Sequence, residues 1–225
     1  KSGISHFIEH SVFKGTRNRN EREIASSIES SGGYINASTS REWTSYYAHV
    51  LPDEIPLAVD VISDLIKNPL FMKEAIEMER FVIQDEIKGF NDSPESLLFF
   101  NALKSSFGNK HPLSSPILGT EESIRGIDDG DLREFWNDKY RTSRIYVSAA
   151  GKINHDKVCT LIEENLGVLN NGNFSRNVVP VEKSGKNIVR KPELNHEYIA
   201  LSSSSFPYNN NERFPFLVLL SILGM

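Results

Sequence analysis

Two histidines and a glutamate lie close together near the start of the chain. In the stretch SHFIEHSVFKGT, residues 5–16, they are His6, Glu9 and His10. Residues four apart on a helix project from the same face, so both imidazoles can bind one divalent metal through ring nitrogens. Glu9 borders that face, where a carboxylate can take a proton from a metal-bound water. The order H-x-x-E-H is the reverse of the commoner H-E-x-x-H zinc helix.

The same histidine pair also has a simpler interpretation, as a solvated helix face or a satisfied pair in the core. A catalytic zinc needs a third protein ligand, so the metal hypothesis depends on finding one. In EAIEMERFVIQDEIKGF, Glu79 and Glu86 are 7 residues apart (86 − 79) and share a helix face beside apolar residues. A carboxylate on a buried face needs a partner, and a metal is one. The alternative is that both glutamates are surface charges.

Helical and extended patterns alternate along the chain and must position these side chains. Apolar spacing and capping residues predict helices over 3–15, 20–33, 52–68, 73–92, 93–108, 127–140, 154–167 and 212–224. β-branched and aromatic residues predict paired strands over 34–40 and 43–51, further strands over 144–151 and 197–206, and a polar loop over 170–187. Because strict β-α-β alternation is absent, the pattern favours an α+β fold, a mostly antiparallel sheet packed against helices on one face.

Composition and charge limit the kinds of molecule that this chain is expected to bind. The 225 residues carry a net charge of −5, which gives no electrostatic reason to expect nucleic acid or an anionic membrane as partner. No apolar run has the length needed to span a bilayer. The single cysteine, Cys159, cannot form an internal disulfide, and its amphipathic context predicts a half-buried core position. A chain without a disulfide framework fits a reducing compartment.

Four segments of the chain, in order, resemble one family of enzymes. GISHFIEHSVFKGT is similar to the zinc helix of the pitrilysin-type metallopeptidases, the inverted zincins that include insulin-degrading enzyme and mitochondrial processing peptidase. ERFVIQDEI, GGYINASTSREWTSYYAHVL and HPLSSPILGT resemble that family's downstream glutamate motif, its edge strand and a loop motif. The chain departs from the family pattern at Ser11, Asp85 and Ser114. The motif spacing resembles the bacterial and organellar processing-peptidase branch. The resemblance therefore implies a processing-peptidase-like metallohydrolase half as the fold, and the bacterial cytoplasm as the compartment, with an organellar matrix second.

The resemblance implies roles for the histidines and glutamates quoted above. One Zn²⁺ per chain is expected on His6, His10 and Glu86, with Glu9 as the general base that activates a zinc-bound water. Glu79 is implied as an outer carboxylate that orients the catalytic site. The implied activity is that of a zinc metalloendopeptidase acting on peptides or unfolded protein segments.

The resemblance also implies how a substrate is held. Asn36 and Ala37 are expected beside the scissile bond, on an edge strand to which an extended peptide can add. Without the family, an ordinary strand end would be the better interpretation of this pair.

The family's chamber is closed by a second half, which gives an expectation for the domain organisation. Residues 1–225 are predicted to be the zinc-bearing N-terminal catalytic half, truncated at both ends. A second homologous half or subunit is the expected partner, with a homodimer as another arrangement. Two other functions stay open: a catalytically silent scaffold or substrate-presenting subunit, and a non-hydrolytic metal-binding domain. Silent members usually lose a ligand or the base, and this chain keeps all four residues, which favours the enzyme.

Overall fold

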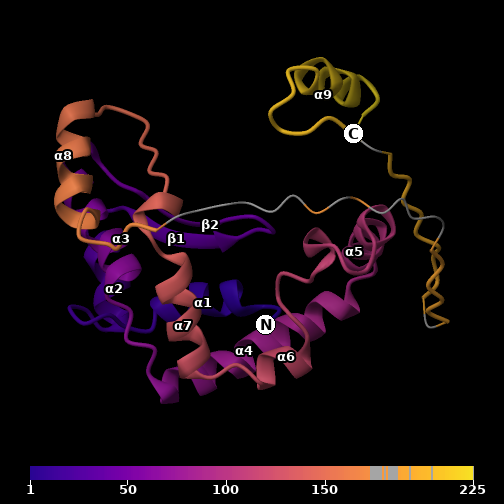
Figure 1. The fold of residues 1–225 in the computed structure, drawn as a ribbon, viewed down its shortest axis with the longest axis horizontal. Coiled ribbons are helices and arrows are strands. Elements are labelled where there is room, and N and C mark those ends of the chain that lie inside the picture. The colour runs from indigo at the N-terminus through magenta and orange to yellow at the C-terminus, as the bar shows by residue number, and fades with distance from the viewer. Residues whose placement is uncertain (173–178, 180, 182–186, 193, 204, 225) are drawn as a thin grey trace. The chain divides into compact units, whose positions relative to one another are not determined.

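The chain folds into two compact units. The computed structural model (Figure 1) describes all residues except 173–178, 180, 182–186, 193, 204 and 225, so most of the predicted polar loop over 170–187 lies outside the described residues. The first unit contains Lys1–Asp92 and Ser115–Val178, and the second contains Ser93–Ser114 and Val179–Met225.

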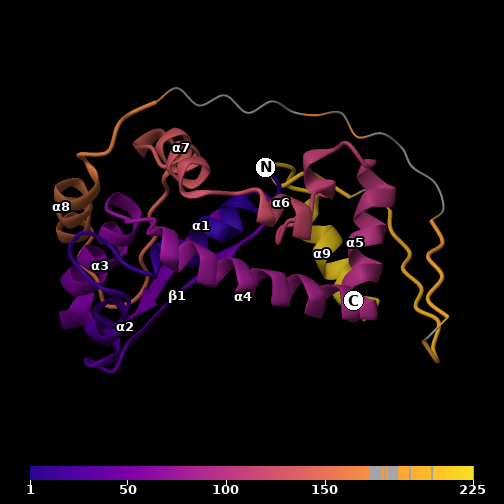
Figure 2. The ribbon, with the colours of Figure 1, turned by 90° about the horizontal axis from the view of Figure 1, so that it is seen from below.

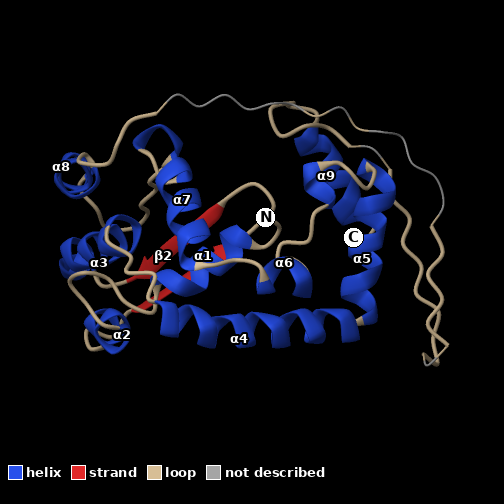
Figure 3. Ribbon diagram, turned by 60° about the horizontal axis from the view of Figure 1, so that its bottom comes forward, coloured by secondary structure: helices blue, strands red, loops and turns tan. Residues whose placement is uncertain are grey.

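The first unit combines one hairpin with several helices. Its helices are α1 (Ile4–Val12), α2 (Glu21–Glu29), η1 (Pro52–Glu54), α3 (Ile55–Lys67), α4 (Lys73–Asp92), α6 (Glu121–Arg125), α7 (Asp129–Lys139), η3 (Thr142–Arg144) and α8 (His155–Leu166). Its strands, β1 (Tyr34–Thr39) and β2 (Thr44–His49), pair antiparallel, with Tyr34 opposite His49 and Thr39 opposite Thr44. Figure 3 shows the two strands in red beside α1 and α7.

Helix α1 lies at the centre of the core of this unit. Phe7, Ile8 and Val12 expose none of their surface, and the helix packs against the hairpin, α4 and α7. Figure 2 shows α1 beside the long helix α4. Each large apolar side chain buried in this way contributes about 1.5–3 kcal/mol. This packing therefore holds the polar face of α1 firmly against α4.

The hairpin has one covered face. Along β1, Ile35, Ala37 and Thr39 are half-buried, whereas the intervening Tyr34, Asn36 and Ser38 are exposed. Helices α1 and α2 pack against β1, and α1 and α3 pack against β2. The predicted class, α+β with helices against an antiparallel sheet, is confirmed.

The predictions of two strands and of one core residue were wrong. Neither 144–151 nor the described part of 197–206 forms a strand, and Tyr146 and Leu201 are 92% and 91% exposed. A strand requires a neighbour that pairs with its backbone, and an apolar pattern cannot supply that neighbour. Cys159 is exposed on α8, because the face of this helix that carries it is not covered in the described structure.

The regular elements described in the second unit are helices. It contains α5 (Pro94–Phe107), which packs against η2 (Pro112–Ser114), and α9 (Arg213–Ile222). Ser93 caps α5 by accepting a hydrogen bond from the N–H of Ser96, as its sequence position predicts. Within the described part of the chain, no helix is both long and apolar enough to cross a membrane.

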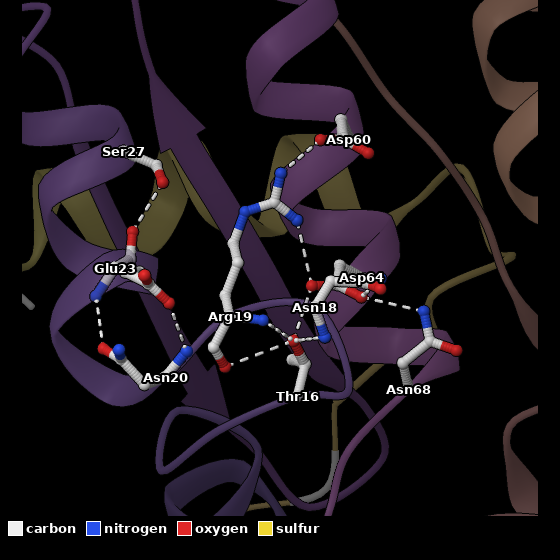
Figure 4. Close-up of polar contacts among 9 residues, drawn as sticks. All are labelled: Thr16, Asn18, Arg19, Asn20, Glu23, Ser27, Asp60, Asp64 and Asn68. Carbon is white, nitrogen blue, oxygen red and sulfur yellow. Dashed lines mark hydrogen bonds and ion pairs between the residues drawn. The ribbon is translucent and has the colours of Figure 1, made fainter.

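A buried carboxylate fastens the loop after α1 to α3 (Figure 4). Asp64 is 2% exposed and accepts hydrogen bonds from Thr16, Asn18, Arg19 and Asn68, at 2.6 to 2.9 Å. Figure 4 also shows the neighbouring capping box of α2, in which the side chains of Asn20 and Glu23 each accept the other's backbone N–H. The connection between α1 and α2 is thus held by Asp64 over residues 16–19 and by the capping box where α2 begins.

Replacing Asp64 is expected to destabilise the protein. Asp64→Asn removes the negative charge and directs an amide N–H₂ toward donors that then lack an acceptor. We expect the free energy of unfolding to fall by about 2–4 kcal/mol, as for other broken buried charge pairs. The matched control is Asp60→Asn, because the Asp60 side chain also pairs with Arg19 but is 52% exposed; it should cost less than about 1 kcal/mol. Urea unfolding measures both, and equal stabilities of the two variants would contradict this expectation.

The same comparison should depend on pH. Burial alone raises the pKa of Asp64, but its hydrogen bonds outweigh that effect and leave the pKa below the ordinary 3.8. A carboxyl with a depressed pKa stabilises the folded state above its unfolded pKa and loses that contribution as the pH falls through the folded value. The stability gap between the wild type and Asp64→Asn should therefore be full at neutral pH and shrink below about pH 4.

Candidate metal centre

Three potential metal ligands converge between α1 and α4. Nε2 of His6 lies 3.6 Å and Nε2 of His10 lies 3.7 Å from the carboxylate oxygens of Glu86, and the three side chains each offer a ligand atom within 4.8 Å of the others. The two imidazole rings are 4.6 Å apart at their centroids, as one helical turn dictates. The structure thus brings together the three residues that the family resemblance implies as metal ligands.

The geometry of this trio fits a zinc ion. Zinc bonds of about 2.0–2.1 Å in a tetrahedron place ligand atoms about 3.4 Å apart. The separations of 3.6 Å from His6 to Oε2 of Glu86 and of 3.7 Å from His10 to Oε1 are close to that spacing, and one ligand atom of each side chain lies within 4.8 Å of the others. Two imidazoles and one carboxylate are also the donor types that zinc prefers, and three protein ligands leave a fourth position open.

Glu79 contacts the ring nitrogen of His10 that does not face Glu86. Its Oε2 lies 3.0 Å from Nδ1 of His10, and its Oε1 lies 2.9 Å from Nζ of Lys14. The Glu79 side chain is only 8% exposed, so Lys14 and His10 compensate much of the cost of burying its charge. Since a carboxylate accepts, Nδ1 of His10 donates to Glu79, and its Nε2 faces Glu86. The pattern of the sequence predicted Glu79 but not Lys14.

His6 is held in its neutral form. Burial, and then the nearby charge of His10, lower its pKa from 6.5 to about 4. A neutral imidazole has the free lone pair that a metal ligand needs. Its Nδ1 is buried and has no hydrogen-bond partner among the described residues. His6 and His10 therefore differ in how their second ring nitrogen is supported.

Glu9 lies beside the trio and is bonded to the hairpin. Burial raises its pKa, and the hydrogen bond that the hydroxyl of Thr39 donates to its Oε2 partly opposes that rise. Thr39 Oγ1 is also 3.3 Å from Oγ1 of Thr44. A carboxylate with an elevated pKa is better matched to proton transfer near neutral pH than an ordinary one.

Two tyrosines that the sequence pattern did not single out lie near Glu9. The hydroxyls of Tyr46 on β2 and Tyr140 after α7 are 2.8 Å apart. Burial raises the pKa of Tyr140 to about 12 and that of Tyr46 well above 10, and the charge of Glu9 acts in the same direction. Both phenols therefore stay protonated beside the site. Tyr46 lies within the quoted edge-strand motif, whereas nothing in the sequence around Tyr140 marked it.

The predicted substrate residues lie on β1. Asn36 is exposed and Ala37 is half-buried, and the N–H of Ala37 donates to Oδ1 of Asn36 at 2.8 Å. In the described part of the chain β1 pairs with β2 alone, so its other edge has no strand partner there. That arrangement suits the addition of an extended peptide.

Comparisons with known proteins assign the family. The sequence model of the insulinase family (peptidase family M16) matches residues 1–121, more than half of the chain. The chain belongs to peptidase family M16. A second model, of the M16 inactive domain, matches residues 126–225. All five residues around the candidate metal, His6, Glu9, His10, Glu79 and Glu86, lie in the first match.

Relatives of this M16 chain include proteases of bacteria and mitochondria. It is 33% identical over 223 residues to the uncharacterized zinc protease YmxG of Bacillus subtilis, covering 99% of this chain and 54% of that protein. It is 30% identical over 224 residues to the mitochondrial-processing peptidase subunit beta of Blastocladiella emersonii, covering 99% and 48%. The chain thus spans about half the length of the relatives it matches.

Solved structures share the fold of this M16 chain. A protease from Helicobacter pylori superposes with a TM-score of 0.71 at 25% identity, covering 80% of this chain and 43% of that one. Pitrilysin gives a TM-score of 0.69 at 23% identity, covering 80% and 20%, which shows the likeness of fold alone. The predicted resemblance to pitrilysin-type peptidases is confirmed.

Proposed function

We propose that residues 1–225 form the zinc-bearing half of a zinc-dependent endopeptidase. The observation that carries the proposal is the convergence of His6, His10 and Glu86 with Glu9 one residue before the second histidine. Glu9 bonds to the hairpin, outside the ligand trio, so it is free for a different task. A non-hydrolytic metal-binding domain would have no use for such a residue.

Each side chain then has a definable task in peptide hydrolysis. His6, His10 and Glu86 would hold the zinc, and Glu79 would fix the ring of His10. Zinc at this position would supply a Lewis acid that polarises the scissile carbonyl and acidifies water. Glu9 would take the proton of the attacking water and return it to the leaving amine.

The hairpin is the proposed substrate platform. An extended peptide or unfolded segment would pair with the open edge of β1 at Asn36 and Ala37. The N–H of Ala37 is taken by the side chain of Asn36, so this side chain would have to rotate for the peptide backbone to accept from that N–H. The small side chain of Ala37 would let the substrate backbone approach closely.

The proposed enzyme needs a partner to close its chamber. The chain spans about half of its relatives' length, one matched structure is named the first half of a periplasmic protease, and another relative is named a subunit. A second homologous half or subunit is therefore the proposed partner, with a homodimer as the other arrangement. The bacterial cytoplasm stays the predicted compartment, with an organellar matrix second.

A silent scaffold or substrate-presenting subunit is the second candidate function. The observation in its favour is the match of residues 126–225 to the M16 inactive domain. This match excludes the ligand trio and Glu9, all of which lie before residue 121. The enzyme is thus the better supported candidate.

One experiment separates these functions. The complete protein that carries this chain is purified, its zinc is measured by atomic emission, and its cleavage of an internally quenched peptide is followed with and without a chelator. The proposed enzyme should hold about one zinc per chain and lose cleavage with the metal. A zinc protein without cleavage would favour the metal-binding or silent alternatives, and a zinc-free protein would overturn the proposal.

A further inference from the structure

We infer that Thr39 is a positioning residue for Glu9, and that Thr44 orients Thr39 in turn. The inference rests on the proposed function, in which Glu9 is the general base. It goes beyond that function by assigning one carboxylate oxygen of Glu9 to the contact with Thr39 and the other to the proton of the attacking water. The observation behind the inference is a run of three hydrogen-bonding side chains, which leads from Thr44 through Thr39 to Glu9.

The hydrogen bonds of this run can be counted. A threonine hydroxyl has one proton to donate and lone pairs to accept. Thr39 spends its proton on Oε2 of Glu9, so at the contact with Thr44, 3.3 Å away, it can only accept. Thr44 must therefore be the donor there. The hydroxyl protons of Thr44 and Thr39 are then both donated in the direction of Glu9.

This count divides the two carboxylate oxygens of Glu9 by role. Oε2 is occupied by an O–H donor, whereas Oε1 has no hydrogen-bond partner among the described residues. Oε1 is thus the oxygen left to receive a proton from water. A donor on Oε2 also limits rotation of the carboxylate, which keeps Oε1 in one direction.

The hairpin is rigid at the point where Thr39 lies. Thr39 and Thr44 are the last opposed pair of β1 and β2, and the turn beyond them is closed by the N–H of Ser40 donating to the carbonyl of Trp43 at 2.8 Å. The guanidinium of Arg41, in the same turn, donates to the carbonyl of Ser115 at 2.9 Å. Because the end of the hairpin is anchored, a hydroxyl placed there can define a position for Glu9.

The other groups near Glu9 do not replace this contact. His10 and Glu86 act on Glu9 through charge, and Glu9 in turn acts on the hydroxyl pair of Tyr46 and Tyr140. In the part of the chain that the structure describes, Thr39 is the hydrogen-bond partner of the Glu9 side chain. Removing its hydroxyl should therefore release the carboxylate.

The test compares near-isosteric variants of the complete protein. Thr39→Val keeps the shape and removes the hydroxyl; Thr39→Ser keeps the hydroxyl. Thr160→Val is the matched control, because it makes the same change at an exposed threonine of α8, whose hydroxyl donates to the carbonyl of Asp156 in the same helix. Thr44→Val removes the donor behind Thr39. Kinetics on a quenched peptide give kcat and KM, while zinc content and thermal unfolding are measured on the same samples.

A positioning role predicts a specific pattern. Thr39→Val should lower kcat about 10- to 100-fold, since misplacement of a catalytic group carries a cost of this order. Its KM should stay within about twofold and its zinc content unchanged, because substrate would bind the backbone edge of β1 and Thr39 touches no ligand of the trio. Thr39→Ser should keep most of the wild-type kcat. Thr44→Val should lower kcat about threefold, and Thr160→Val should match the wild type.

Other patterns would overturn the inference. Wild-type kcat in Thr39→Val, or a loss that appears only in KM, would show that Thr39 does not act on Glu9. If Thr39→Val does not fold, Thr39→Ala is measured against Thr39→Ser, and equal kcat values in these two would overturn it as well. An inactive wild type would instead refute the proposed function and the inference with it, so the two failures are told apart by the wild type alone.

Discussion

Glu9→Gln is expected to abolish peptide hydrolysis and to leave the zinc in place. The amide has nearly the shape of the carboxylate but cannot take a proton from water, so a loss of at least about 1000-fold in kcat is expected. Glu9 contributes no atom to the trio of His6, His10 and Glu86, and its Oε2 is bonded to Thr39. Zinc content should therefore stay near one per chain. The intact metal would distinguish a missing base from a disrupted site.

The measurement is single-turnover cleavage of a quenched peptide with zinc analysis of the same sample. Glu29→Gln is a suitable control, since Glu29 is an exposed glutamate at the end of α2 and should give wild-type rates. Glu9→Gln should still bind peptide, because the substitution leaves the edge of β1 unchanged. Wild-type turnover in Glu9→Gln would refute the proposed mechanism, and loss of zinc would show that Glu9 is a ligand.

The second large effect is expected for Glu86→Ala, which should remove zinc from the metal site. It removes one of three protein ligands, so zinc occupancy should fall from about one to below about 0.1 per chain after dialysis. Glu79→Gln should behave differently, because Glu79 contacts His10 and Lys14 rather than the open centre of the trio. For such an outer partner, a 10- to 100-fold loss of zinc affinity is expected, with occupancy retained at excess zinc.

Asp85→Ala is the control for both variants. Asp85 precedes Glu86 on α4, but its carboxylate is exposed and pairs with Lys88 at 2.8 Å. Its replacement should leave zinc affinity unchanged, as is usual for exposed ion pairs. Competition with a chromophoric chelator measures all three affinities. Full zinc occupancy in Glu86→Ala would show that the third ligand has been assigned wrongly.

The local patterns of the sequence determined the faces of the helices that carry the site. The helical repeat is about 3.6 residues. Spacing by four therefore places His6 and His10 on one face of α1, and spacing by seven places Glu79 and Glu86 on one face of α4. Capping residues such as Asn20 and Ser93 also marked helix starts correctly, since they satisfy backbone groups within the next turn. These properties depend on neighbours along the chain, and a sequence displays them directly.

The resemblance to a family supplied what local patterns cannot. Glu86 follows His10 by 76 residues (86 − 10), and no spacing rule links residues so far apart. Only the packing of α1 on α4 brings Glu86 within 3.7 Å of His10. The quoted motifs suggested that these two segments belong to one site, and the folded chain places them side by side.

Tertiary structure alone decided the supporting contacts and the extent of the sheet. The bonds from Lys14 to Glu79 and from Thr39 to Glu9 depend on how loops and the hairpin dock on α1, so residue type gave no sign of them. The segment 144–151 has the composition of a strand but no strand in the described structure pairs with it. Pairing and docking are decided by distant parts of the chain, because hydrogen bonds between segments exist only once both are in place.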